Sequence, residues 1–175
     1  WNKVVRTGLV REDNIMFPEG MRNEDTDWSA SVLEHAQSVG WLDDPYYCYR
    51  KGTGYAQTSK PITRSMTDDL AKVIEKHVAA IDELGLSGAE ALSIRAYLAY
   101  PFIVWMGQAA ALDCRKDDRT SREMCVHAPL LLTADEDRAV HLASLSYHVF
   151  GFWGTARLLG IAFRLTRLSS LRHQS

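Results

Sequence analysis

Two stretches of the chain carry no charged side chain, and they limit what the chain can fold into. The first covers residues 96–112 and the second covers 139–156, after which Arg157 is followed by more apolar sequence up to residue 163. At about 1.5 Å of rise per residue, a helix over the first stretch is roughly 25 Å long, close to the roughly 30 Å hydrocarbon core of a bilayer. Each stretch is therefore expected either to span a membrane or to be buried within protein.

The second stretch has the periodicity of a helix that packs against another helix. Its apolar residues recur at alternating spacings of three and four. They are Leu142, Leu145, Val149, Phe152, Ala156, Leu159 and Phe163. A partner helix is expected to start at Ser87 and to run toward Leu112, interrupted or kinked near Pro101. Together the patterns predict a long apolar helical hairpin formed by 88–112 and 134–172.

The sequence before this hairpin predicts an amphipathic helix over about residues 66–84. Its apolar positions are again three and four residues apart, and Gly85 is expected to end it. His77 falls on the apolar face, and the sequence shows no evident acid or nucleophile partner for it.

The first 65 residues differ from the rest because turn-forming residues are frequent in them. They contain one convincing helix, from about Asp27 to Val39. We therefore predict an all-α protein with two regions: an extended, turn-rich arm with one helix over 1–65, and a helical region over 66–175. The second region contains the amphipathic helix and the apolar hairpin.

Charge is distributed unevenly along the chain, although the formal net charge is only -2. Residues 1–137 hold 15 Lys and Arg against 22 Asp and Glu, whereas 138–175 hold five Arg and no acid. This balance excludes a generally basic nucleic-acid-binding domain. The C-terminal arginines alternate with apolar residues, as expected for a helix against anionic lipid, an acidic partner or the chain's own acidic front, or for a solvated helix end. They are Arg157, Arg164, Arg167 and Arg172.

Few residues are candidates for metal binding or catalysis. Asp137, His141 and His148 share one helix face, so they could approach one ion, but histidines packed or capped inside a helical pair explain the spacing better. The cysteines Cys114 and Cys125 are expected to be unpaired thiols. No nucleophile motif is present. We therefore expect no catalytic residue and no cofactor.

The arm carries a series of short motifs in a definite order. The stretch GLVREDNI, from Gly8 to Ile15, comes first. It is followed by Asn23, Glu24, Asp25, Leu42, Asp43, Asp44, Tyr46, Tyr47, Arg50 and Lys51. Over about residues 3–84 this series resembles the small matrix-side subunit of the mitochondrial cytochrome bc1 complex, subunit 7. Residues 87–175 have no counterpart in that family.

The resemblance implies a non-catalytic accessory subunit, structural or assembling, of a respiratory-chain complex on the matrix side of the mitochondrial inner membrane. Its partners would be the other subunits of that membrane complex and an anionic lipid such as cardiolipin. The expected interface residues are Arg11, Glu12, Asp13, Tyr46, Tyr47 and Arg50. The alternatives are a soluble all-helical binding domain and, with less support, a histidine-containing metalloenzyme.

Overall fold

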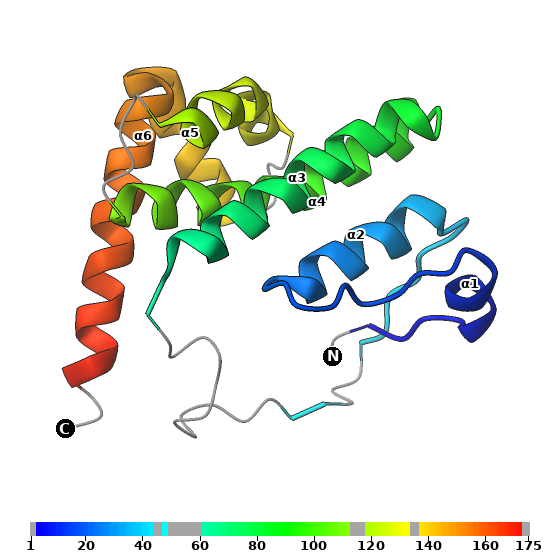
Figure 1. The fold of residues 1–175 in the computed structure, drawn as a ribbon. Helices are drawn as coiled ribbons and strands as arrows, with labels where there is room; N and C mark the ends of the chain where they lie inside the picture. The colour runs from blue at the N-terminus through cyan, green and yellow to red at the C-terminus, as the bar shows by residue number, and fades with distance from the viewer. Residues whose placement is uncertain (1–2, 44–46, 49–60, 113–117, 134–136, 173–175) are drawn as a thin grey trace.

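The protein is all-α in the part of the chain that the structure describes, which confirms the predicted fold class. The computed structural model describes residues 3–43, 47–48, 61–112, 118–133 and 137–172, with side chains up to 165. These residues form six α-helices, one 3-10 helix and no strand (Figure 1). The helices are α1 (Thr7–Glu12), α2 (Glu24–His35), α3 (Arg64–Glu83), α4 (Gly88–Ala111), α5 (Arg119–Met124), η2 (Cys125–Leu132) and α6 (Arg138–Arg172). None of the described helices combines the length and the apolar character that a membrane span requires.

Helices α3 and α4 lie side by side and are joined by the turn that the sequence predicts at Gly85 (Figure 1). Gly85 has a φ of 66°, which is the left-handed conformation that glycine adopts without strain. Its N–H donates to the Asp82 carbonyl at 3.1 Å, and the Leu86 N–H donates to the Ile81 carbonyl at 2.9 Å. These two bonds form a Schellman cap, so the last carbonyl groups of α3 are satisfied where the chain reverses.

Helix α4 supplies much of the hydrophobic core because most of its length is enclosed by other helices. Its rings pack with Phe152 of α6: the Phe102 and Trp105 centroids are 5.9 Å apart, and each is 6.4 Å from the Phe152 centroid. The helix continues through Pro101, where the sequence predicted an interruption or a kink. Pro101 is itself buried, and we infer that the surrounding packing outweighs the roughly 3 kcal/mol that an internal proline costs a helix.

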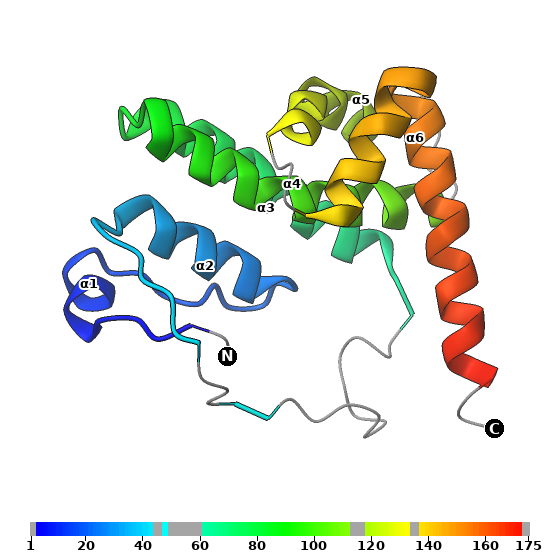
Figure 2. The same ribbon diagram turned by 180° about the vertical axis from the view of Figure 1, so that it is seen from behind.

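The helical break lies instead at Gly151, inside α6. Its φ of 65° and ψ of -175° are not helical. Residues other than glycine essentially never adopt this backbone conformation. The chain turns sharply there, so α6 consists of a proximal segment, 138–150, and a distal segment, 152–172 (Figure 2). The prediction of one long helix over 134–172 is therefore wrong at this residue.

The distal segment packs closely on α4. A Cβ at Gly160 would lie only 2.7 Å from the Ala110 Cβ, so glycine allows the two backbones to approach. The Arg164 guanidinium donates to the Ala111 carbonyl at 2.9 Å. A cation at the C-terminal end of α4 satisfies its free carbonyl groups and interacts favourably with the helix dipole.

The arm contains two helices, α1 and α2, where the sequence predicted one. Helix α2 begins three residues earlier than predicted, directly after Asn23, whose φ is 65°. Acidic side chains fill its first turn, which the helix dipole favours. Phe17, between the two helices, stacks on Trp28 of α2 with centroids 4.9 Å apart. The short helix α1 has no strong periodicity in the sequence, and six residues are too few to show one.

Candidate functional site

Four ionisable side chains form a connected group between α2 and α3. The Asp27 carboxylate on α2 accepts from Lys76 Nζ on α3 at 2.8 and 3.0 Å. It also lies 3.0 Å from His77 Nε2. The other ring nitrogen, His77 Nδ1, is 2.5 Å from Glu34 Oε1. Two residues of α2 and two of α3 thus form one connected network, the buried ionic cluster.

This cluster is closed to solvent at its histidine. The His77 side chain is 0% exposed, and the side chains of Asp27 and Glu34 are nearly as buried. Because carboxylates only accept, both ring nitrogens can donate to them only when the ring is doubly protonated. The network therefore fixes α2 to α3, and its histidine has no free nitrogen to offer a substrate.

Tyr97 of α4 contacts α2 close to the buried ionic cluster. Its hydroxyl donates to the Thr26 carbonyl at 3.2 Å. Burial raises the pKa of the Tyr97 phenol, the nearby carboxylates of Asp25 and Asp27 raise it further, and a hydrogen bond with Ser29 partly opposes them. The phenol thus stays neutral and serves as a hydrogen-bond donor that links α4 to α2.

The sequence analysis missed the partners of His77, although it placed the residue on the buried face of its helix. A signal was present, since a polar side chain on a buried face needs a hydrogen-bond partner. Asp27 and Glu34 are seven residues apart and therefore share one face of α2. The missing information was that this face packs on α3.

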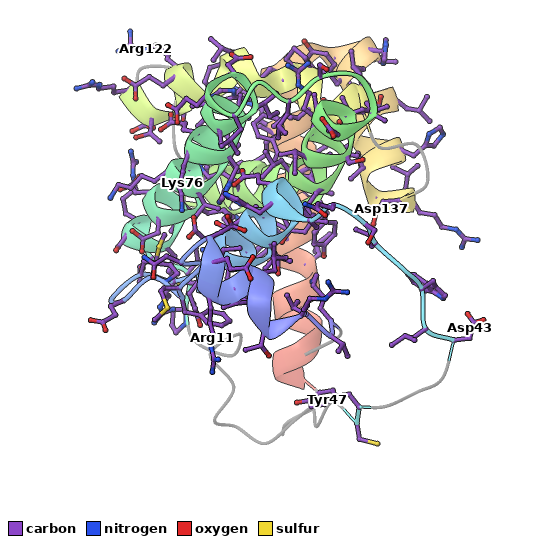
Figure 3. The ribbon with its side chains drawn as sticks, turned by 90° about the vertical axis from the view of Figure 1, so that its right-hand side faces the viewer. Arg11, Asp43, Tyr47, Lys76, Arg122 and Asp137 are labelled. Carbon is purple, nitrogen blue, oxygen red and sulfur yellow. The ribbon has the colours of Figure 1, made fainter. Side chains whose placement is uncertain are left out.

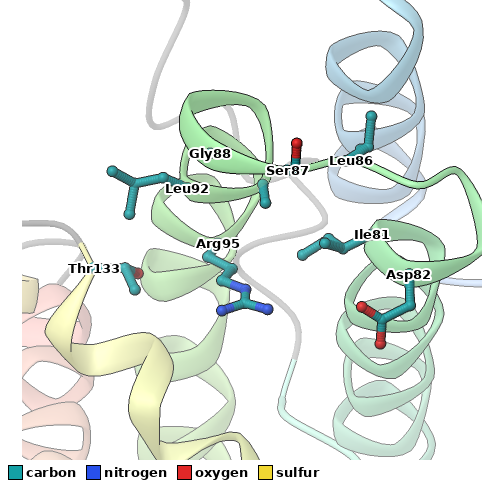
Figure 4. Close-up of a pocket in the computed structure, with 9 residues that line it drawn as sticks. Ile81, Asp82, Leu86, Ser87, Gly88, Leu92, Arg95 and Thr133 are labelled. Atoms are coloured by element: carbon teal, nitrogen blue, oxygen red, sulfur yellow. The ribbon is translucent and has the colours of Figure 1, made fainter.

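A cavity of about 470 Å³ opens at the C-terminal end of α3, beside the start of α4 (Figure 4). Arg95 of α4 and Asp82 of α3 contribute its charged groups from neighbouring helices. The hydroxyl groups in its lining belong to Ser87 and Thr133. No histidine lines the cavity, so the buried ionic cluster is not part of it.

Two of the three predicted metal ligands make other contacts in the structure. Asp137 Oδ1 caps α6 by accepting from the backbone N–H groups two and three residues further on, at 2.8 and 3.0 Å. His148 Nδ1 lies 2.8 Å from the Ser144 carbonyl, and His141 is exposed. Among the described residues, no three His, Cys, Asp or Glu side chains form a group that could hold a metal ion. Cys125 is a free thiol, and Cys114 lies outside the described residues.

The predicted interface residues of the arm are exposed where the structure describes them. Arg11 and Glu12 belong to α1, and Asp13 follows directly as its C-cap. Figure 3 shows Arg11 at the edge of the molecule and Tyr47 on the segment that leads away from the helices. Tyr46 and Arg50 lie outside the described residues.

The four C-terminal arginines divide into three cases. Arg157 is exposed on α6. Arg164 donates to the end of α4, a contact within the molecule that the sequence did not indicate. Arg167 and Arg172 belong to the helical part of α6, and their side chains lie outside the described residues.

Exposed apolar side chains recur at helical spacing on both segments of α6. We call Leu142, Leu145 and Val149 the proximal stripe; they are 52% to 72% exposed. Leu158, Ile161 and Leu165 form the distal stripe and are 47% to 61% exposed. Both sets have the spacing i, i+3, i+7, which aligns side chains along one helix face. Clustered apolar groups in water mark an interaction surface more often than scattered ones do.

Comparison with known proteins assigns no family to the chain. No protein-family model matches it, and neither a curated protein nor a solved structure matches it. Functional conclusions must therefore rest on the chemistry and placement of its own residues.

Proposed function

We propose that this protein is a non-catalytic accessory subunit that binds a partner protein through the proximal stripe of α6. The observation that carries the proposal is the exposure of Leu142, Leu145 and Val149 on one face of a well-formed helix. Three branched apolar side chains at this spacing form a ridge that fits between the side chains of a second helix.

The energetics favour such a partner. Full burial of one Leu or Val side chain stabilises by about 1.5 to 3 kcal/mol, so three together supply several kcal/mol toward association. The opposite face of the same segment is already in the core, because Val140 and Ala143 are buried. The segment is therefore held in place from behind, and a partner does not need to order it.

A supporting rather than a chemical role fits the buried ionic cluster. The residue type most often used for proton transfer near neutral pH is histidine. His77, which is flanked by two carboxylates as a catalytic histidine could be, uses both ring nitrogens to join α2 to α3. Its contacts thus support a role in fixing the arm to the helical region.

The N-terminal resemblance makes the proposal more specific, because it names the assembly and the side of the membrane; we call this the finer form of the proposal. It implies that the assembly is a respiratory-chain complex of the mitochondrial inner membrane, with this subunit on the matrix side. That form is supported by the motifs of residues 8–15 and 23–51 alone. The exposed charges of Arg11 and Glu12 on α1 are suitable for contacts with other subunits.

The test is native-gel migration of the full-length protein after extraction in mild detergent. We expect the wild-type protein to co-migrate with other polypeptides and the variant L142Q/L145Q/V149Q to lose them. The matched control is L158Q/I161Q/L165Q, which removes three similarly exposed side chains from the same helix and should keep the partners. Equal thermal melting of both variants shows that they fold.

Two results would overturn parts of the proposal separately. A monodisperse wild-type monomer that melts cooperatively and has no co-migrating polypeptide contradicts the accessory role. Co-migrating proteins that mass spectrometry identifies as something other than respiratory-chain subunits contradict the finer form and leave the partner-binding role intact.

A further inference from the structure

We infer that the distal stripe, together with Arg157, docks on the surface of a phospholipid bilayer that carries anionic headgroups. This inference does not depend on the proposed protein partner, because it concerns the other segment of α6. It rests on three observations: the direction in which the stripe faces, the charge along its edge, and its convex position on the molecule.

The distal stripe faces away from the body of the protein. Phe152 and Ala156, which lie on the opposite side of the distal segment, are buried against α4. Leu158, Ile161 and Leu165 are consequently the groups that the segment presents outward. A surface that approaches this helix from outside meets the apolar stripe first.

The edge of the stripe is cationic. Arg157 and Arg164 directly precede Leu158 and Leu165, and their spacing of seven places both on the same side of the stripe. Arg157 is exposed, and no acidic residue shares its helix, because residues 138–175 contain no Asp or Glu. The sequence adds Arg167 and Arg172 to the same helix. An apolar face bordered by arginines is typical of helices that lie in the plane of a membrane interface.

Charge also distinguishes between the kinds of surface that could cover the distal stripe. A second copy docked through its own α6 would bring the same acid-free, arginine-bearing helix, and like charges would oppose its approach. The occupant must be anionic and must also accept apolar side chains. The interface of an anionic bilayer offers both, with headgroups for arginine and acyl chains for leucine and isoleucine.

The position of the distal segment suits a broad, flat surface. The segment continues past the end of α4 at the edge of the molecule, as both ribbon views show (Figures 1 and 2). Its outer face is therefore a ridge that a bilayer can reach without any rearrangement. An acidic protein would instead need a groove shaped to this ridge.

The proximal stripe provides a matched comparison within the same helix. It has the same number of exposed apolar side chains and the same spacing. Its nearest arginine, Arg138, follows Asp137 directly, so this stripe lacks a net cationic edge. If apolar exposure alone caused lipid binding, both stripes would bind alike.

The experiment is co-sedimentation of the full-length protein with vesicles of phosphatidylcholine, with and without phosphatidylglycerol. We expect binding to the vesicles that contain phosphatidylglycerol, weakened by added salt because screening reduces attraction between charges at the surface. The variant L158Q/I161Q/L165Q should lower the partition constant by at least about tenfold. R157Q should lower it by about fivefold, and L142Q/L145Q/V149Q should leave it unchanged.

Several outcomes would overturn the inference. These are no binding of the folded wild-type protein, equal binding to vesicles of phosphatidylcholine alone, or equal losses in the two triple variants. If the distal variant instead loses co-migrating proteins on a native gel while the wild type ignores vesicles, the stripe is a protein-binding surface. Failure of the vesicle assay leaves the role of the proximal stripe untouched, so the two proposals can fail separately.

Discussion

The two segments of α6 carry one apolar pattern but bury it differently. Before Gly151 the residues of the three-four pattern, such as Leu145 and Val149, are more than half exposed. After Gly151 the pattern continues with Phe152 and Ala156, and both are buried. The pattern does not change at this point, so the difference arises from the backbone.

The comparison shows what periodicity can and cannot establish. A spacing of three and four identifies residues that share a helix face, provided that the helix is continuous. One residue with a φ of 65° ends that continuity, and the face after it points in a new direction. The distal face meets Phe102 and Trp105 of α4, whereas the proximal face is exposed.

The largest expected effect tests this difference directly. Phe152→Ala removes a buried ring that packs on Phe102 and Trp105, and it should lower the free energy of unfolding by about 3 to 5 kcal/mol. Val149→Ala, one step earlier in the same pattern, should change it by no more than about 0.5 kcal/mol. Urea denaturation followed by circular dichroism measures both. Similar losses in the two variants would mean that the segments are not packed differently.

A smaller effect is expected at the residue that separates the segments. Gly151→Ala adds a Cβ that meets no atom within 4 Å, so any loss reflects backbone strain alone. Strain of this kind costs about 1 to 3 kcal/mol, which the same denaturation experiment should show. Gly40→Ala is the control, because Gly40 also lies in open space but lacks a positive φ. A Gly151→Ala protein as stable as the wild type would argue against a left-handed break at this position.

The parts of the fold that the sequence predicted depend on local interactions. The turn at Gly85, the start of α4 after Ser87 and the helical character of 138–172 all follow from side chains a few residues apart. Local rules also place His77 on the inner face of α3, where it is found. Such features depend on neighbouring residues and require no knowledge of contacts between distant parts of the chain.

What could not be predicted depends on tertiary contacts. The partners of His77 are 43 and 50 residues away, so only the packing of α2 on α3 brings them together. Pro101 was expected to interrupt or kink its helix, and Gly151 was not, because local rules rank proline as the stronger helix breaker. Burial of α4 holds the proline in a helix, whereas the glycine adopts the conformation that the turn of α6 requires.

The smallest expected effect concerns two glycines on opposite sides of the α4 and α6 interface. A Cβ at Gly160 would lie 2.7 Å from the Ala110 Cβ and 3.1 Å from its carbonyl carbon, so the backbones must separate. At Gly107 the nearest atoms would be 3.5 Å away, which is ordinary contact. Alanine is favoured over glycine in a helix by about 1 kcal/mol at both positions.

The balance between crowding by the added Cβ and the higher helix propensity of alanine has opposite signs at the two sites. Gly160→Ala should destabilise by a net of about 1 kcal/mol, since crowding of about 1 to 3 kcal/mol exceeds the gain in helix propensity. Gly107→Ala should be neutral or should stabilise by up to about 1 kcal/mol. Thermal melting of the two single variants distinguishes the signs. If Gly160→Ala also stabilised, the distal segment would not lie against α4 as closely as its buried face requires, and the contrast with the proximal segment would weaken.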